Sequence, residues 1–197
     1  GTTGSATVDG AGSTWTNSGD LKVGNSGAGT LTIRNGGAVS NAVGFLGSLA
    51  GSTGTATVDG AGSAWTNSGN LVVGNSGTGT LTIRNGGTVS NVIGDLGNNA
   101  GSTGTVTVDG AGSSWSSGAL YVGDSGAGTL TIRNGGAVSN ATIGHLGFNA
   151  GSTGTVTVDG AGSSWTNSGL VVGFRGTGTL TIQNGGAVSN VGNGFLG

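Results

Sequence analysis

The sequence predicts an all-β protein, a parallel β-solenoid of about eight coils with about 25 residues in each coil and no helix. Two observations predict this fold. The chain repeats itself every 50 residues or so, and each repeat is a doublet of two similar halves. Within each half, apolar residues alternate with threonine over a few positions and then stop at Gly, Asn or Asp, which is typical of short strands and turns.

The long repeat appears in three recurring strings. Gly-Ser-Thr-Gly-Thr stands at Gly51, Gly101 and Gly151, with a variant at Gly1. Gly-Thr-Leu-Thr-Ile and a single tryptophan also recur once in each repeat. We therefore expect one solenoid domain, residues 1–197, made of the repeats 1–50, 51–100, 101–150 and 151–197, and we expect it to be a fragment of a longer array.

Each half-repeat contains three short predicted strands. In the half that carries tryptophan, which we call type A, they cover residues 55–58, 63–66 and 71–73. The other half, type B, repeats the same pattern about 25 residues later, with valine in place of tryptophan. Three strands in 25 residues fit one solenoid coil, whereas a propeller blade, the competing interpretation, needs about 40–45 residues and four longer strands.

Alternation along the first strand separates an inner face from an outer face. The residues expected inside are Ala6, Val8, Leu31, Ile33, Ala56, Val58, Leu81, Ile83, Val106, Val108, Leu130, Ile132, Val156, Val158, Leu180 and Ile182. In the second strand the expected inner column alternates tryptophan with valine: Trp15, Val39, Trp65, Val89, Trp115, Val138, Trp165 and Val188. A tryptophan column can also be a stacking platform for sugars, but its alternation with valine favours core packing.

A column of asparagine follows the second strand. It comprises Asn17, Asn41, Asn67, Asn91, Asn140, Asn167 and Asn190, with Ser117 in one coil. Stacked amides can hydrogen-bond along the axis of such a solenoid.

The outer face of the first strand is predicted to carry two threonine rows and a charge ladder. The threonine array comprises Thr30, Thr32, Thr55, Thr57, Thr80, Thr82, Thr105, Thr107, Thr129, Thr131, Thr155, Thr157, Thr179 and Thr181, with Ser5 and Thr7 in the first coil. The ladder alternates in sign: Asp9, Arg34, Asp59, Arg84, Asp109, Arg133 and Asp159, followed by Gln183. Because like charges in adjacent coils repel, alternation favours one register and accounts for the doublet.

The third strand is harder to align in the type B coils. Val-Ile-Gly at 92–94 can match Val-Val-Gly at 72–74, which would leave residues 95–102 as a longer loop. Positions 45, 95, 145 and 195 in that loop are Phe, Asp, His and Phe, so we expect it to vary most. The single histidine, His145, is accordingly expected to be a solvated loop residue.

The composition excludes several functions. Only 6% of the residues are charged and the net charge is −2, so there is no basic surplus for nucleic acid. No apolar run is long enough to cross a membrane. We expect no catalytic, cofactor-binding or metal-binding residues, because no Cys, no P-loop and no His cluster is present. Asp9 and Asp59 would lie two coils apart, but the same pair recurs along the stack and does not form one site with two unlike carboxylates.

The repeat strings resemble a known family. Residues 79–91, Gly-Thr-Leu-Thr-Ile-Arg-Asn-Gly-Gly-Thr-Val-Ser-Asn, and residues 100–115 are similar to the T5SS/PEP-CTERM-associated repeats of type V secretion autotransporter passenger domains. The resemblance implies a right-handed β-helix in a secreted or surface-displayed bacterial passenger, at an extracellular or cell-surface location. Such passengers are long stalks for adhesion or biofilm formation, so a host or matrix surface is an implied partner.

Two classes of function remain open. The first is a structural or adhesive element, a rigid stalk or fibre-forming region whose open end coils also allow end-to-end self-association. The second is an ice-binding module, because a Thr-x-Thr array on a solenoid face resembles that of insect antifreeze proteins. Against the second class, threonine is common in any exposed strand, and the charged ladder borders the array.

Overall fold

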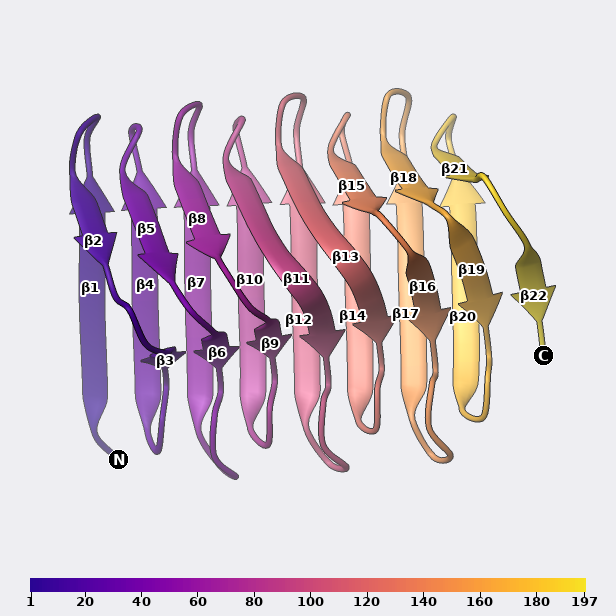
Figure 1. Ribbon diagram of the computed structural model, residues 1–197, viewed down its shortest axis with the longest axis horizontal. Helices are drawn as coiled ribbons and strands as arrows, with labels where there is room; N and C mark the ends of the chain where they lie inside the picture. Colours follow the sequence, from indigo (N-terminus) through magenta and orange to yellow (C-terminus); the bar gives the residue numbers. More distant parts are fainter.

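The computed structural model describes all of residues 1–197 and contains 22 strands and no helix. Every strand pair in it is parallel, and each strand pairs with its equivalents in the neighbouring coils. The predicted β-solenoid of eight coils is therefore confirmed. In Figure 1 the chain runs up at the back, down at the front and advances from left to right, which is a right-handed winding.

The first strand of each coil lies in one sheet of eight seven-residue strands. Their order in this sheet follows the order of the coils. The strands are β1 (Thr3–Asp9), β4 (Ala28–Arg34), β7 (Thr53–Asp59), β10 (Thr78–Arg84), β12 (Thr103–Asp109), β14 (Ala127–Arg133), β17 (Thr153–Asp159) and β20 (Thr177–Gln183). They begin two residues earlier than the sequence pattern predicts, as β7 starts at Thr53 instead of Thr55.

The second and third strands of the coils form one sheet of 14 strands. The second strands are β2 (Thr14–Thr16), β5 (Ala38–Asn41), β8 (Ala64–Asn67), β15 (Ala137–Asn140), β18 (Ser164–Asn167) and β21 (Ala187–Asn190). The third strands are β3 (Leu21–Val23), β6 (Gly44–Leu46), β9 (Leu71–Val73), β16 (Ile143–Leu146), β19 (Gly169–Val172) and β22 (Gly194–Leu196). In the fourth and fifth coils both positions belong to one long strand, β11 (Thr88–Leu96) or β13 (Ser114–Val122).

The predicted alignment of the third strand is wrong. The strand partners of Leu71, Val72 and Val73 are Gly94, Asp95 and Leu96, not residues 92–94. Positions 45, 95, 145 and 195 therefore lie in strands β6, β11, β16 and β22, not in a variable loop. The alignment was wrong because it matched Gly94 with Gly74, which follows the end of its strand, whereas Gly94 lies inside β11.

That glycine is required by packing against tryptophan. A side-chain carbon placed on Gly94 would lie 2.6 Å from Cζ2 of Trp115 in the next coil, and one on Gly144 would lie 2.8 Å from Cζ2 of Trp165. Type A coils thus contribute a large tryptophan and leucine, and type B coils contribute valine and glycine at the same positions. The two coil types fill each other's space, which gives a second physical reason for the doublet.

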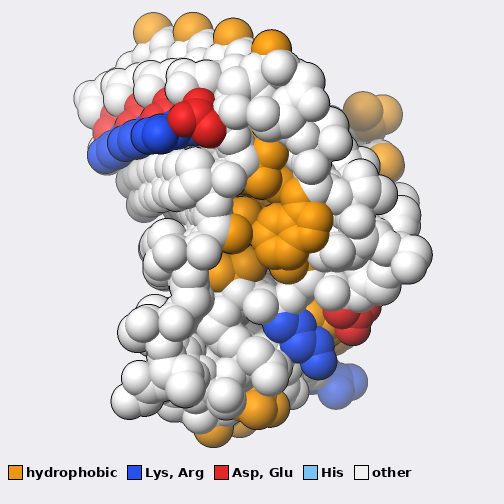
Figure 2. Space-filling model, turned by 90° about the vertical axis from the view of Figure 1, so that its left-hand side faces the viewer, with side chains coloured by type: hydrophobic (Ala, Val, Ile, Leu, Met, Phe, Trp, Pro, Cys, Tyr) orange, Lys and Arg blue, Asp and Glu red, His pale blue; other side chains and the backbone are white.

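The interior is one continuous apolar core. A cluster of 29 buried residues runs through the stack, and Trp65, Trp115 and Trp165 are at most 1% exposed. Figure 2, seen from the end with the first coil, shows apolar side chains filling the space that the coil encloses. The prediction that the tryptophan column is core is confirmed, and burial removes these three rings as a sugar platform. In the end coils, Ala6, Trp15, Leu180 and Val188 are only partly buried, and Ile182 is 49% exposed.

Candidate functional surfaces

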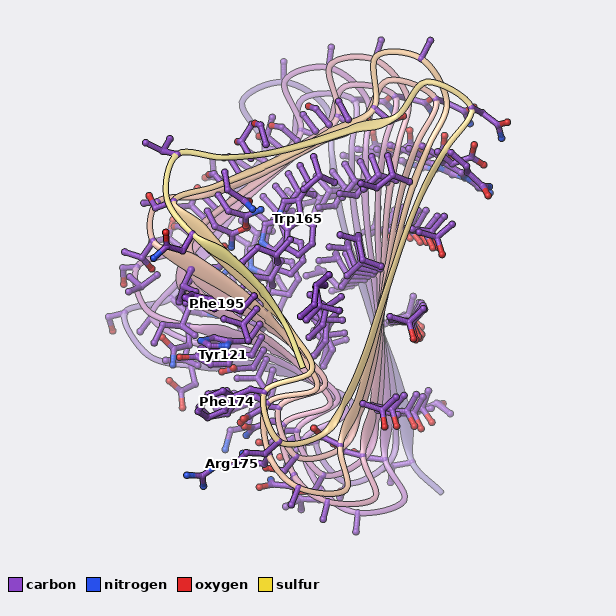
Figure 3. The ribbon with its side chains drawn as sticks, turned by 90° about the vertical axis from the view of Figure 1, so that its right-hand side faces the viewer. Tyr121, Trp165, Phe174, Arg175 and Phe195 are labelled. Carbon is purple, nitrogen blue, oxygen red and sulfur yellow. The ribbon has the colours of Figure 1, made fainter.

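The threonine array lies on the outer side of the eight-stranded sheet. The strand register aligns its rows from the first coil to the last, with Thr30 beside Thr55 and Thr80 beside Thr105. Figure 3 shows these rows as columns of short side chains with oxygen ends along the sheet. Because the strands start early, a third row that the sequence analysis missed joins the array: Thr3, Ala28, Thr53, Thr78, Thr103, Ala127, Thr153 and Thr177.

The hydroxyls of this array are free of side-chain hydrogen bonds within the chain. The only threonine hydroxyls that take part in such bonds belong to Thr16, Thr88 and Thr142, which lie elsewhere. The array is therefore a regular hydroxyl surface that faces solvent.

The charge ladder borders the array and pairs within each doublet. Arg84 Nη2 lies 2.9 Å from Asp59 Oδ2, and the pairs Arg34–Asp9 and Arg133–Asp109 are equivalent. The adjoining bands of blue and red side chains at the upper left of Figure 2 are this ladder. No ion pair joins one doublet to the next, and Asp159, which faces Gln183, has none. Since the arginines are about half exposed, solvent screens these pairs, and each contributes little to stability.

Each ladder aspartate has a second partner that the sequence analysis missed. Asn85 Nδ2 donates a hydrogen bond of 2.7 Å to Asp59 Oδ1, and Asn134 does the same to Asp109. The hydrogen bond from Asn85, followed by that from Arg84, lowers the pKa of Asp59 below its usual value. Asn85 has a φ of 54°, a left-handed conformation that asparagine tolerates. This conformation turns the chain at the corner that follows the strand.

Inside the stack the asparagine column is buried or half-buried and serves the tryptophans, whereas Asn190 in the last coil is exposed. Asn41 Nδ2 donates a hydrogen bond of 2.8 Å to Asn67 Oδ1, as the predicted ladder along the axis requires. In addition, the indole N–H of Trp65 donates to Asn41 Oδ1 at 2.7 Å, and Trp115 and Trp165 bond in the same way to Asn91 and Asn140. The column therefore satisfies the one polar atom of each buried ring.

His145 is not the solvated residue that the sequence predicts. It lies in β16, is 9% exposed, and its ring stacks on Tyr121 with centroids 5.1 Å apart. Burial lowers the pKa of His145, and its buried Nδ1 has no hydrogen-bond partner.

His145 belongs to what we call the variable face. This face comprises the middle residue of each third strand and the residue after the glycine that follows it. The strand residues are Lys22, Phe45, Val72, Asp95, Tyr121, His145, Val171 and Phe195, and the loop residues are Asn25, Ser48, Asn75, Asn98, Asp124, Phe148 and Phe174. Outside this face and the segment just before the third strand, the repeat changes little, whereas here the pair of residues differs from each coil to the next.

Aromatic rings gather on the variable face between the fifth and seventh coils. The ring centre of Phe148 lies 5.0 Å from that of Tyr121 and 4.8 Å from that of His145. Phe148 also stacks on Phe174, with ring centres 5.3 Å apart. Arg175 lies over the Phe174 ring at 5.4 Å. In Figure 3, Tyr121, Phe174 and Arg175 lie on the outside of the coils, while Trp165 lies inside. No pattern within a single coil predicts this cluster, because it joins residues from three coils.

Asp95, at the edge of the aromatic cluster, is the most perturbed acid of the chain. Burial, with a smaller contribution from Asp124, raises the pKa of Asp95 from 3.8 to about 7. The folded protein thus holds this proton more tightly than the unfolded chain does. The resulting stabilisation is complete below about pH 4 and is lost as the pH rises towards about pH 7.

Asp95→Asn should remove this pH dependence, because the amide resembles the neutral carboxylic acid. At about pH 8 we expect the variant to be more stable than the parent by on the order of 2–4 kcal/mol, with little gain at about pH 4. Urea unfolding at several pH values measures the difference. Asp20→Asn, in an exposed loop, is the matched control; the same pH-dependent gain in both variants would contradict this account of Asp95.

The structure assembles no group of three or more His, Asp or Glu side chains suited to a metal ion, and none of its segments is a helix able to span a membrane. By fold the chain is a parallel β-solenoid with two coil types, a hydroxyl array, a charge ladder and one variable face. Compared with protein-family models, with curated proteins and with solved structures, it matches none of them.

Proposed function

We propose that this chain is a rigid structural repeat region, a stalk or fibre-forming element. The observation that carries the proposal is the unbroken register: all eight first strands pair residue for residue, so each coil presents the surface that the next coil fits. Because each coil pairs only with its neighbours, the rod can be lengthened without changing any existing contact.

The resemblance of the repeats to autotransporter passengers supplies a context. On that basis we place the chain in a bacterial secreted or surface-displayed protein, where a rod would hold an adhesive region away from the cell or contact a matrix surface itself. The scarcity of charge and the exposed hydroxyl rows are compatible with an extracellular rod.

The coil edges support elongation. Inside the stack, a type A coil always follows the edge of a type B coil, with the tryptophan of the former bonded to the asparagine of the latter. The edge of the eighth coil is of type B and exposes Ile182 and Leu196, at 49% and 84%. A type A coil therefore fits this edge, whether it belongs to the same chain or to a second copy.

A molecule of residues 1–197 alone should associate head to tail, and such a contact propagates because it does not close. Light scattering and negative-stain microscopy at rising concentration should show thin fibres. Leu196→Lys should suppress them by placing a charge on the edge, whereas Leu49→Lys, equally polar but on a side loop with Leu49 51% exposed, should not. A parent chain that stays monomeric at the highest concentration would count against the fibre role.

Ice binding is the second candidate, and the third threonine row favours it by widening the hydroxyl surface. The neighbouring ladder and the twist of the sheet, visible as the fanning of its strands in Figure 3, weigh against it. An ice-shaping assay decides between the two: an ice-binding chain shapes crystals, and Thr105→Tyr in the middle of the array abolishes the effect. Absence of any effect of the parent chain on ice growth removes this candidate.

A further inference from the structure

The variable face contains carboxylates that no cation of the chain neutralises. Asp95 is the strand partner of Tyr121 in the neighbouring coil, and Asp124 follows Tyr121 by three residues. Burial raises the pKa of Tyr121, and the two carboxylates raise it further. Asp95 forms no ion pair and accepts no side-chain hydrogen bond, and Asp124 accepts only one, from Asn149 at 3.0 Å. All three ion pairs of the chain belong to the distant ladder.

A third polar group in the same place is also unsatisfied. His145 packs against both Tyr121 and Phe148, is nine-tenths buried, and leaves Nδ1 without a partner. A buried polar atom without a hydrogen bond is costly, and native proteins contain few of them. The other two in this chain, Asn91 Nδ2 and Asn167 Oδ1, belong to the asparagine column. The acidic residues and this imidazole thus lie in one place on the variable face, and the chain leaves the charges of the former and the Nδ1 of the latter without partners.

The chemistry of that partner follows from the rest of the variable face. Wherever a cation is present on it, the cation lies on an aromatic ring: Lys22 Nζ is 5.6 Å from the centre of Phe45, and Arg175 is 5.4 Å from that of Phe174. Between these two places the rings of Tyr121 and Phe148 have carboxylates beside them and no cation above them. A cation placed on these rings would gain a cation–π interaction with the ring and electrostatic attraction to the carboxylates.

We propose that the strip formed by Asp95, Tyr121, Asp124 and Phe148 binds an arginine side chain in a basic segment of a partner protein. The guanidinium group pairs with the two carboxylates, and its flat face stacks on the side of Tyr121 that is not stacked on His145, with the Phe148 ring, turned by 74° from that of Tyr121, beside it. A compact, strongly hydrated ammonium group makes this combination of contacts less well. The strip from Asp95 to Phe148 covers two coil spacings, about 10 Å, which matches about three residues of an extended peptide. The site goes beyond the structural role proposed above and does not depend on it.

Isothermal titration of the 197-residue chain with tri-arginine at about pH 8, above the pKa of Asp95, tests the site, with tri-citrulline as the uncharged isostere. We expect tri-arginine to bind at least about tenfold more tightly than tri-citrulline. Asp124→Asn should weaken binding by about tenfold, and Phe148→Leu, which keeps an apolar side chain but removes the ring, by several-fold. Asp20→Asn removes the same charge elsewhere and should leave the affinity unchanged.

Each alternative outcome overturns the proposal. Equal losses in Asp124→Asn and Asp20→Asn would mean a general charge effect without a site. Equal binding of both peptides, or no binding of either, would exclude guanidinium recognition, and spermidine binding as tightly as tri-arginine would assign the strip to polyamines. Melting curves of Asp124→Asn and Phe148→Leu confirm that both variants are folded before they are titrated.

Discussion

Gly104→Ala is expected to unfold or severely destabilise the solenoid. A side-chain carbon at Gly104 would meet backbone on every side: the Val73 carbonyl oxygen, the Gly97 nitrogen at 2.6 Å and the Leu96 Cα at 2.8 Å. At this level of the coil the first and third strands touch through their backbones, and the bond from the Gly97 nitrogen to the Val73 oxygen, 2.9 Å long, lies in the way. Overpacking together with the loss of this buried bond should cost about 3–5 kcal/mol or more.

The first coil offers a matched control for this substitution. Gly4 is the equivalent of Gly104, but an added carbon there has no atom within 4 Å. Gly4→Ala should therefore change stability little, as measured by urea unfolding followed by circular dichroism. If both alanine variants unfold like the parent, the two sheets do not approach each other as closely as described here.

Trp115→Ala should cost about 3–5 kcal/mol, because it leaves a cavity in a core where the parent side chain is 1% exposed. It also leaves Asn91 Oδ1 without the indole donor that now lies 2.6 Å away. Trp115→Phe, which keeps most of the ring volume and loses only the donor, should cost much less.

A double-mutant cycle tests the packing of the two coil types more strictly. Gly94→Ala should be strongly destabilising in the parent, since the new carbon would lie 2.6 Å from the tryptophan ring. In the Trp115→Ala background the same change should be tolerated, because the ring is gone, so the two effects should be far from additive. Additive costs would mean that Gly94 is not there to make room for Trp115.

The parts of the fold that depend on alternation within one coil could be predicted from the sequence. The first strand alternates strictly, and the structure places Leu81 and Ile83 inside and Thr80 and Thr82 outside as expected. The alignment of Asp59 with Arg84 followed from the same pattern. What these predictions share is that each needs only the two-residue period of a strand and the length of the repeat.

The parts that depend on contacts between coils could not be predicted in this way. Gly94 looks like a turn until Trp115 of the next coil is placed against it, and the error in the third strand followed from that. With that alignment wrong, His145 was assigned to a loop, and the column from Asp95 through Tyr121 to His145 was hidden. The one usable signal was the loss of repeat identity at positions 45, 95, 145 and 195, which marked the variable face without showing what it contains.

A distance measured along the stack tests the rod most directly. The chain has no cysteine, so Thr7→Cys and Thr181→Cys give two unique spin-label sites in the first and eighth coils. Seven coil spacings predict a narrow distribution of distances near about 34 Å by electron–electron double resonance. A second copy of residues 51–100 inserted after Ala100 should lengthen that distance by about 10 Å, the height of two coils, without broadening it. An unchanged mean distance, or a broad distribution in the longer chain, would contradict a rod built from interchangeable doublets.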